Sequence, residues 1–199
     1  MTNPVYDKLR NCYDSIKDEI PFEPKVALVL GSGLGDYAEQ LEIQGTIDYR
    51  DIEGFPVSTV PGHKGRFVFA RINGVPAVLM QGRVHYYEGY SMSDVVLPAR
   101  LMKLMGAKIL FLTNAAGGVN YDYGAGDFML IKDQISCFVP SPLIGPNLEE
   151  LGPRFPDMSH IYDEDLRDII RSTALELGIR IQEGSMYSSQ DLPMKVRMR

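Results

Sequence analysis

The sequence lacks tryptophan and has only two cysteines and three histidines in 199 residues. Cys12 and Cys137 form no CxxC motif and have no histidine-rich neighbourhood, which disfavours a zinc site or a disulfide framework. We therefore expect free, buried thiols in a reducing compartment. No apolar run reaches the roughly 20 residues of a membrane helix, and the first residues do not resemble a secretory signal. These absences predict a cytoplasmic location.

Positive charge is in the minority, because 20 Lys and Arg stand against 26 Asp and Glu, for a formal net charge of -6. Nucleic acids and anionic membranes select cationic protein surfaces, so neither is an expected partner. Hydrophobic residues make up 45% of the chain, which is typical of globular proteins. We expect a single domain over residues 1–199 with a substantial core, in which any anion site is local.

Hydrophobic periodicity predicts helices and strands around one central sheet, an α/β fold. Helical spacing is found at residues 4–19, 93–105 and 166–177. Strand patterns are found at residues 26–30, 67–72, 75–80, 108–113, 127–131 and 179–181. The strands at 26–30 and 108–113 are continuously apolar, as is typical of strands buried on both faces. Asn73-Gly74 predicts a type I′ turn, and residues 140–156, rich in Pro and Gly, predict a long surface loop.

A glycine-rich turn, Gly31-Ser32-Gly33-Leu34-Gly35, directly follows the first predicted strand. Glycines let backbone N–H groups approach an anion, and Ser32 adds a hydroxyl, so phosphate is the expected ligand. The turn lacks the lysine of a Walker A loop and the spacing of a dinucleotide-binding motif. Taken alone, such a glycine-rich turn is more often a plain tight turn.

Two more segments combine glycines with cations. His63, Lys64 and Arg66 precede a predicted strand, although a solvated turn is the more frequent explanation of such a cluster taken alone. Residues 81–90 follow another predicted strand and contain Arg83 and His85. An arginine can grip phosphate bidentately, and a histidine beside it can donate a further hydrogen bond.

Glu88, three residues after His85, is placed to orient or charge that imidazole. The alternative is a local Arg–Glu pair at the end of a surface hairpin, which adds little stability. A further run of small residues, 113–118, follows the strand at 108–113. Small residues at the carboxyl end of a strand let the backbone approach a ligand, so this run and the glycine-rich turn suggest one crevice.

In order and spacing, these segments resemble the trimeric type of purine nucleoside phosphorylase in the nucleoside phosphorylase family. The resemblance rests on GSGLG at 31–35, STVPGHKGR at 58–66, QGRVHYYEGY at 81–90, TNAAGGVN at 113–120, GDFMLIKDQIS at 126–136 and GPRFPDMS at 152–159. It implies a mixed, distorted central sheet or barrel flanked by helices. It also implies a transferase in which phosphate converts purine ribonucleosides or deoxyribonucleosides into free purine and sugar 1-phosphate, without metal or organic cofactor.

The resemblance also implies roles for individual residues. The phosphate site is implied to consist of Ser32, His63, Arg83, His85 and the backbone of Ala115. The implied catalytic residues are His85 and Glu88, the latter acting on the phosphate site through His85. Tyr87 is implied to hold the ribose 3′-hydroxyl, and Phe155 to reach over the ribose of a neighbouring subunit in a homotrimer.

The resemblance extends to about Tyr187, after which the family's Gly-Pro-Ser-Tyr-Glu-Thr run has no counterpart. In the family, that run and the segment beyond it bind the purine, so the resemblance implies a chain without the C-terminal third. Three functions stay open: a purine nucleoside phosphorylase, a catalytically inactive relative that keeps only phosphate binding, and a methylthioadenosine phosphorylase. Ser32 disfavours the last, because such relatives usually carry threonine at this position.

Overall fold

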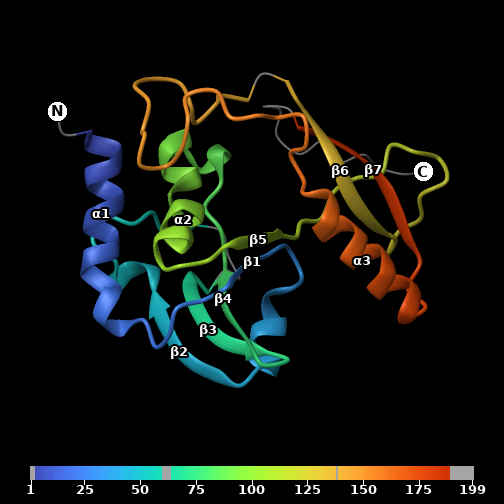
Figure 1. The fold of residues 1–199 in the computed structure, drawn as a ribbon, viewed down its shortest axis with the longest axis horizontal. Helices are drawn as coiled ribbons and strands as arrows, with labels where there is room; N and C mark the ends of the chain where they lie inside the picture. The colour runs from blue at the N-terminus through green and yellow to red at the C-terminus, as the bar shows by residue number, and fades with distance from the viewer. Residues whose placement is uncertain (1–2, 60–63, 138, 189–199) are drawn as a thin grey trace. The chain divides into compact units, whose positions relative to one another are not determined.

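The computed structural model describes residues 3–59, 64–137 and 139–188 (Figure 1). The chain divides into two compact units, residues 1–115 and 116–199. The expected single domain over residues 1–199 stays a prediction, and each unit is described by itself.

The first unit is built on a five-stranded sheet with the order β2-β3-β4-β1-β5. Its strands are β1 (Val26–Leu30), β2 (Ile43–Asp48), β3 (Arg66–Ile72), β4 (Val75–Gln81) and β5 (Ile109–Leu112). β1 lies parallel to both β4 and β5, whereas β3 is antiparallel to β2 and β4. The sheet is therefore mixed, as predicted.

The predicted hairpin between β3 and β4 is confirmed. Asn73 and Gly74 have φ angles of 48° and 82°, the positive values that both central residues of a type I′ turn require. Pairing runs from Ile72 opposite Val75 at the turn to Arg66 opposite Gln81 at the open end. The turn thus fixes the register that brings Arg66 beside Gln81.

Two helices belong to the first unit, α1 (Pro4–Ile16) and α2 (Met92–Leu104). Asn3 caps α1 by accepting a hydrogen bond from the Val5 N–H at 3.0 Å, and the predicted helix ends in a 3-10 turn, η1 (Lys17–Glu19). Ser91 caps α2, since its hydroxyl accepts a hydrogen bond from the Asp94 N–H at 3.2 Å.

α1 and α2 lie side by side (Figure 1), joined by the ion pair of Lys8 Nζ with Asp94 Oδ1 at 2.6 Å. Short 3-10 turns complete the unit: η2 (Gly35–Gln40), η3 (Tyr49–Asp51) and η4 (Tyr86–Glu88). An aromatic cluster of Tyr49, Phe55 and Phe67 lies in its core, with ring centroids 4.9–5.6 Å apart.

The expectation that the strand at 108–113 is buried on both faces is wrong. Leu110, Phe111 and Leu112 are 46%, 40% and 51% exposed. The reason is the strand order, because β5 is an outer strand that pairs with β1 alone in the sheet. In β1, two of the five residues, Val26 and Leu28, are only half-buried.

The second unit contains two parallel strands, β6 (Phe128–Ser136) and β7 (Ile181–Ser188), and a helix, α3 (Glu164–Glu176). β6 begins one residue later than the strand predicted at 127–131 and extends to Ser136, whereas β7 shares only Ile181 with the strand predicted at 179–181. Arg171 of α3 binds Glu183 of β7 through two hydrogen bonds, one of them 2.9 Å long. The described residues of 140–156 form neither helix nor strand, which agrees with the predicted loop.

No helix in the described ranges is both long and apolar enough to cross a membrane.

Candidate active site

The predicted phosphate segments begin at one edge of the sheet. In the parallel pairs, Leu30 lies opposite Gln81, and Val29 lies opposite Leu112. Because the carboxyl ends of parallel strands meet at one sheet edge, residues 31–35, 82–85 and 113–115 leave the sheet as neighbours. This edge is a common position for ligand sites in α/β proteins.

Thr113 joins the glycine-rich turn to the loop after β5. Its hydroxyl donates to the Val29 carbonyl at 2.7 Å and accepts from the Gly31 N–H at 2.8 Å. A Cβ atom on Gly31 would lie 2.6 Å from the Thr113 carbonyl oxygen, so only glycine fits there. The predicted proximity of the two loops is thus confirmed.

The glycine-rich turn presents Ser32 to solvent. The Leu34 N–H donates to the Gly31 carbonyl at 3.0 Å, and Gly33 has a φ of 83°, which closes the turn tightly. Ser32 is exposed at its tip, so its hydroxyl and the neighbouring backbone can meet an anion.

Arg83 extends from the loop after β4 towards the loop after β5. Its guanidinium donates to the Thr113 carbonyl at 3.3 Å. Burial lowers the pKa of Arg83, which means that the cation has lost part of its hydration. A half-buried guanidinium can donate two parallel N–H hydrogen bonds, which suits it to bind two oxygens of one phosphate.

His85 is held by Glu88 in a reciprocal cap of η4. Glu88 Oε1 lies 2.9 Å from His85 Nδ1 and accepts the His85 backbone N–H at 2.7 Å. Because an ionised carboxylate only accepts hydrogen bonds, Nδ1 must carry a proton. The Tyr87 ring stacks on the imidazole with 4.7 Å between centroids.

Glu88 also binds Thr59, which precedes the cations His63, Lys64 and Arg66 in the sequence. Its Oε2 accepts from the Thr59 N–H at 2.6 Å and the Thr59 hydroxyl at 2.8 Å. Burial alone would raise the pKa of Glu88, but the hydrogen bonds from Thr59 and His85 outweigh it and hold the pKa at about 2. Glu88 is therefore an anion throughout the physiological range.

The structure places most of the predicted site residues in the first unit. Those on the strand ends or in the short segments that follow them are Ser32, Arg83, His85, Tyr87, Glu88 and Ala115. His63 lies outside the described residues. Phe155 belongs to the second unit, where its ring is 87% exposed and the Arg154 guanidinium lies 5.9 Å from its centroid.

Sequence reasoning missed the supporting residues Thr59, Gln81 and Thr113. All three occur inside the motifs that carry the resemblance, but their roles come from bonds to residues 15 to 84 positions away. A polar residue at the end of a buried strand was the available signal for Gln81.

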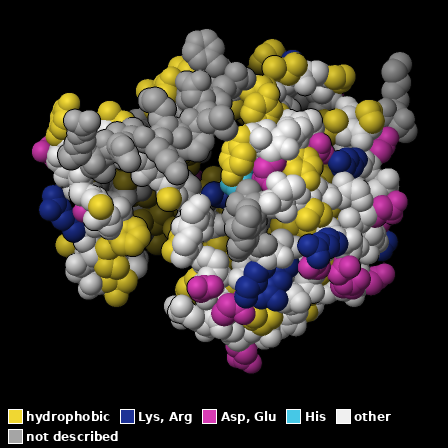
Figure 2. Space-filling model, turned by 180° about the vertical axis from the view of Figure 1, so that it is seen from behind, with side chains coloured by type: hydrophobic (Ala, Val, Ile, Leu, Met, Phe, Trp, Pro, Cys, Tyr) yellow, Lys and Arg dark blue, Asp and Glu magenta, His cyan; other side chains and the backbone are white. Residues whose placement is uncertain are grey.

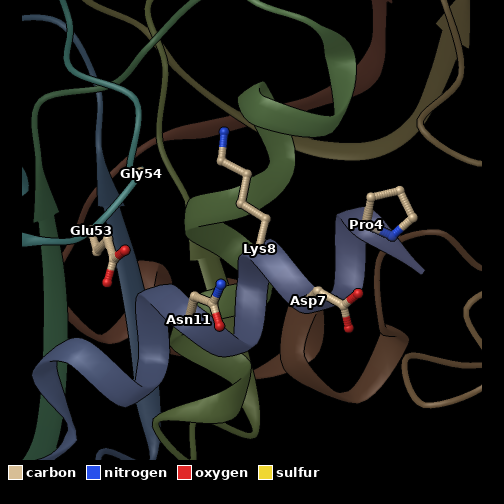
Figure 3. A pocket seen from close by; sticks show the side chains of 6 residues that line it. All are labelled: Pro4, Asp7, Lys8, Asn11, Glu53 and Gly54. Carbon is tan, nitrogen blue, oxygen red and sulfur yellow. The ribbon is translucent and has the colours of Figure 1, made fainter. Parts of the chain in front are cut away.

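A cavity of about 420 Å³ lies beside α1, lined by Pro4, Asp7, Lys8, Asn11, Glu53 and Gly54 (Figure 3). It contains none of the predicted site residues, and the Lys8 ammonium that borders it is already paired with Asp94. Elsewhere in the described parts of the chain, no cluster of three or more His, Cys, Asp or Glu side chains is placed to hold a metal ion.

Comparison with known proteins agrees with this geometry. Residues 25–193 match the family model described as Phosphorylase superfamily, and the chain belongs to that superfamily. Its relatives there are purine nucleoside phosphorylases. It is 46% identical over 195 residues to purine nucleoside phosphorylase 1 of Bacillus subtilis, covering 96% of this chain and 72% of the relative. The corresponding protein of Geobacillus stearothermophilus is 46% identical over 187 residues, with 92% and 68% covered.

Solved structures give the same result. The purine nucleoside phosphorylase from Schistosoma mansoni in complex with acetate superimposes with a TM-score of 0.86 at 38% identity, covering 94% of this chain and 70% of that one. The chain thus spans about 70% of the length of these relatives. The predicted family and fold class are confirmed, and the methylthioadenosine alternative is not favoured.

Proposed function

We propose that the chain catalyses phosphorolysis of purine nucleosides with the edge formed by β1, β4 and β5 as its phosphate side. A phosphate oxygen forms a bond to the anomeric carbon of the sugar, and the bond from that carbon to the purine nitrogen breaks. The purine leaves with the electron pair and takes up a proton, which yields free base and ribose or deoxyribose 1-phosphate. The observation that carries the proposal is the convergence of three phosphate-type loops at one edge.

Phosphate is held by groups from each loop. Arg83 offers paired N–H donors, Ser32 offers its hydroxyl, and Ala115 offers its backbone N–H at the end of the third loop. His63, which the resemblance assigns to the same site, completes this set. Since a reacting sugar gains positive charge, a dianion fixed beside it stabilises the transition state.

His85 supplies a further donor to phosphate, with Glu88 behind it. The ionised Glu88 holds the proton of Nδ1 in a hydrogen bond and fixes the ring, so that Nε2 is the nitrogen left to meet phosphate. Glu88 therefore acts on the substrate through His85.

The sugar is bound by Tyr87 and by Phe155 of a neighbouring copy in a homotrimer. Tyr87 is 57% exposed and has its ring held against His85, so its hydroxyl can reach a ribose 3′-hydroxyl beside the phosphate. The exposed Phe155 ring suits a position over a sugar of another subunit. Solved purine nucleoside phosphorylases from Schistosoma bind ribose 1-phosphate, adenosine or hypoxanthine, which supports a purine nucleoside as the second substrate.

The reaction needs no metal or organic cofactor, because phosphate is itself the co-substrate. We place it in the cytoplasm, without nucleic acid or membrane partners. The acidic net charge and the free thiols of Cys12 and Cys137 support that assignment. Cys12 is buried as expected, whereas Cys137 is only half-buried.

The test is release of hypoxanthine from inosine, followed by absorbance or chromatography. We expect hypoxanthine release that requires phosphate and yields ribose 1-phosphate. In Arg83→Ala the rate of release should fall by at least about a hundredfold. The substitution removes a charge-assisted contact worth about 1.5–3 kcal/mol and the positioning of phosphate that depends on it. Val75→Thr, at the far end of β4, is the matched control. Phosphate binding with no purine release would contradict the proposed activity and favour the relative that only binds phosphate.

A further inference from the structure

Gln81 is a buried polar residue of the first unit, with 2% of its surface exposed. It is the last residue of β4, immediately before the segment that carries Arg83 and His85. A buried carboxamide is costly unless its polar atoms find partners. The partners of Gln81 therefore indicate why this residue type stands at the end of β4.

The carboxamide connects β3 and η2. Arg66 Nε of β3 donates to Gln81 Oε1 at 2.8 Å, and Gln81 Nε2 donates to the Gly35 carbonyl at 2.7 Å and to Glu39 Oε1 at 3.0 Å. The orientation follows from chemistry, because Arg66 only donates while the carbonyl and the carboxylate only accept. Both ends of the carboxamide are hydrogen-bonded.

Gly35 is the last residue of the glycine-rich turn, and Gly31 is the first. Thr113 holds Gly31 from the β5 side, and Gln81 holds Gly35 from the β4 side. Ser32 lies between these two attachments. A hydroxyl that must meet phosphate needs a fixed backbone, since small displacements at such sites cost affinity.

We propose that Gln81 is a positioning residue of the phosphate site, which fixes the glycine-rich turn relative to the loop carrying Arg83 and His85. The role rests on the proposed function, since it concerns the same site. Gln81 acts through the Gly35 carbonyl and has no contact with substrate in this account.

Glu39 makes the proposed role of Gln81 sensitive to the charge of the side chain at position 81. Its Oε1 accepts from Lys64 at 2.7 Å and from Arg66 at 2.6 Å as well as from Gln81, and these donors, Lys64 first, lower the pKa of Glu39 to about 2. A carboxylate at position 81 would therefore face a permanent anion and a carbonyl. Arg66 is the cation on its other side.

Gln81→Glu is the sharpest variant, because it keeps the shape and removes the donor when ionised. At pH 8 the new carboxylate cannot donate to Gly35 and repels Glu39, so we expect phosphate affinity about tenfold below wild type. Burial and Glu39 oppose ionisation of the new carboxyl while Arg66 favours it, and the fraction that is protonated at pH 5.5 can donate again. The phosphate affinity of the variant at pH 5.5 should then lie within about threefold of the wild-type affinity.

Two comparisons complete the design. Gln81→Leu can never donate, so its affinity ratio to wild type should stay constant from pH 5.5 to 8. Val75 lies at the opposite end of β4, and 42% of its surface is exposed. The control variant Val75→Thr should therefore have the phosphate affinity of wild type at every pH. Taking ratios at each pH cancels the titration of phosphate. Phosphate affinity equal to wild type in Gln81→Leu, and at pH 8 in Gln81→Glu, would overturn the proposal.

Hydrogen exchange of the Leu34 amide, which donates to the Gly31 carbonyl at 3.0 Å, separates this role from the proposed function when it is measured without phosphate. We expect protection to fall about tenfold in Gln81→Leu and at pH 8 in Gln81→Glu, with protection in β3 unchanged. Unchanged protection in the turn would overturn the proposal. If wild type binds no phosphate, the proposed function fails while the exchange result still decides whether Gln81 fixes the turn.

Discussion

The Glu88 carboxylate accepts hydrogen bonds from the backbone and side chains of residues on two separate segments. His85 lies three residues away, whereas Thr59 lies 29 residues away. The carboxylate thus fixes an imidazole and a loop with one buried charge, its side chain being 2% exposed. From the sequence, the pairing with His85 was predictable because of the short spacing, but the bond to Thr59 was not, because it depends on how the sheet folds.

Acid should remove the stabilisation that Glu88 provides. Its folded pKa of about 2 lies below the unfolded value of 4.5, so the stabilisation is complete above pH 4.5 and is lost as the pH falls towards 2. Such a shift corresponds to about 3 kcal/mol at neutral pH. We expect Glu88→Gln to lower the free energy of unfolding by about 2–3 kcal/mol at pH 7, and by much less near pH 3.

Urea unfolding followed by circular dichroism at both pH values measures this difference. Asp14→Asn on the exposed face of α1 serves as the control, and it should change stability little at either pH. A Glu88→Gln effect of equal size at pH 3 and pH 7 would show that the carboxylate charge is not what stabilises this loop.

At the scale of elements, the site depends on how β1, β4 and β5 end. The parallel arrangement brings their following loops together, and the close approach of Gly31 to Thr113 is part of that geometry. The sequence indicated these strands through their apolar runs and the hairpin through Asn73-Gly74. It did not indicate the exposure of β5, because an apolar run does not say whether a strand lies inside a sheet or at its edge.

Replacing Gly31 with alanine should disrupt the junction of the two loops. The added Cβ atom would lie 2.6 Å from a backbone oxygen that has no flexible end to move aside. We expect Gly31→Ala to lower the free energy of unfolding by about 1–3 kcal/mol. Gly35→Ala, where a Cβ meets no atom within 4 Å, should change it by less than about 0.5 kcal/mol in the same denaturation experiment. Equal effects of the two substitutions would contradict the close packing of Gly31.

At the scale of the whole molecule, charges of both signs lie next to one another on the face shown in Figure 2, with exposed hydrophobic side chains among them. This mixture fits a protein whose anion site is local, as the composition predicted. The apolar residues of the helix predicted at 166–177 differ in burial, because Ile169 and Leu177 are 59% and 66% exposed while Ala174 is buried. Periodicity identifies an apolar face, but it does not supply the surface that covers it.

The motifs specified the proposed phosphate residues because those residues lie in short segments beside strands, where local sequence is informative. The supporting bonds of Gln81 and Thr113 were not predictable, since each reaches a segment distant in the chain. The proposed role of Phe155, by contrast, rests on the resemblance alone, because the ribose it would cover is bound to a different subunit.

The central claim is that the ends of β1, β4 and β5 form a phosphate site anchored by Arg83. Calorimetric titration of wild type and Arg83→Ala with inorganic phosphate tests it most directly. The account predicts that wild type binds phosphate and that Arg83→Ala binds it at least about tenfold more weakly, since a charge-assisted hydrogen-bond pair contributes about 1.5–3 kcal/mol. Equal phosphate affinity in the two proteins would contradict the claim.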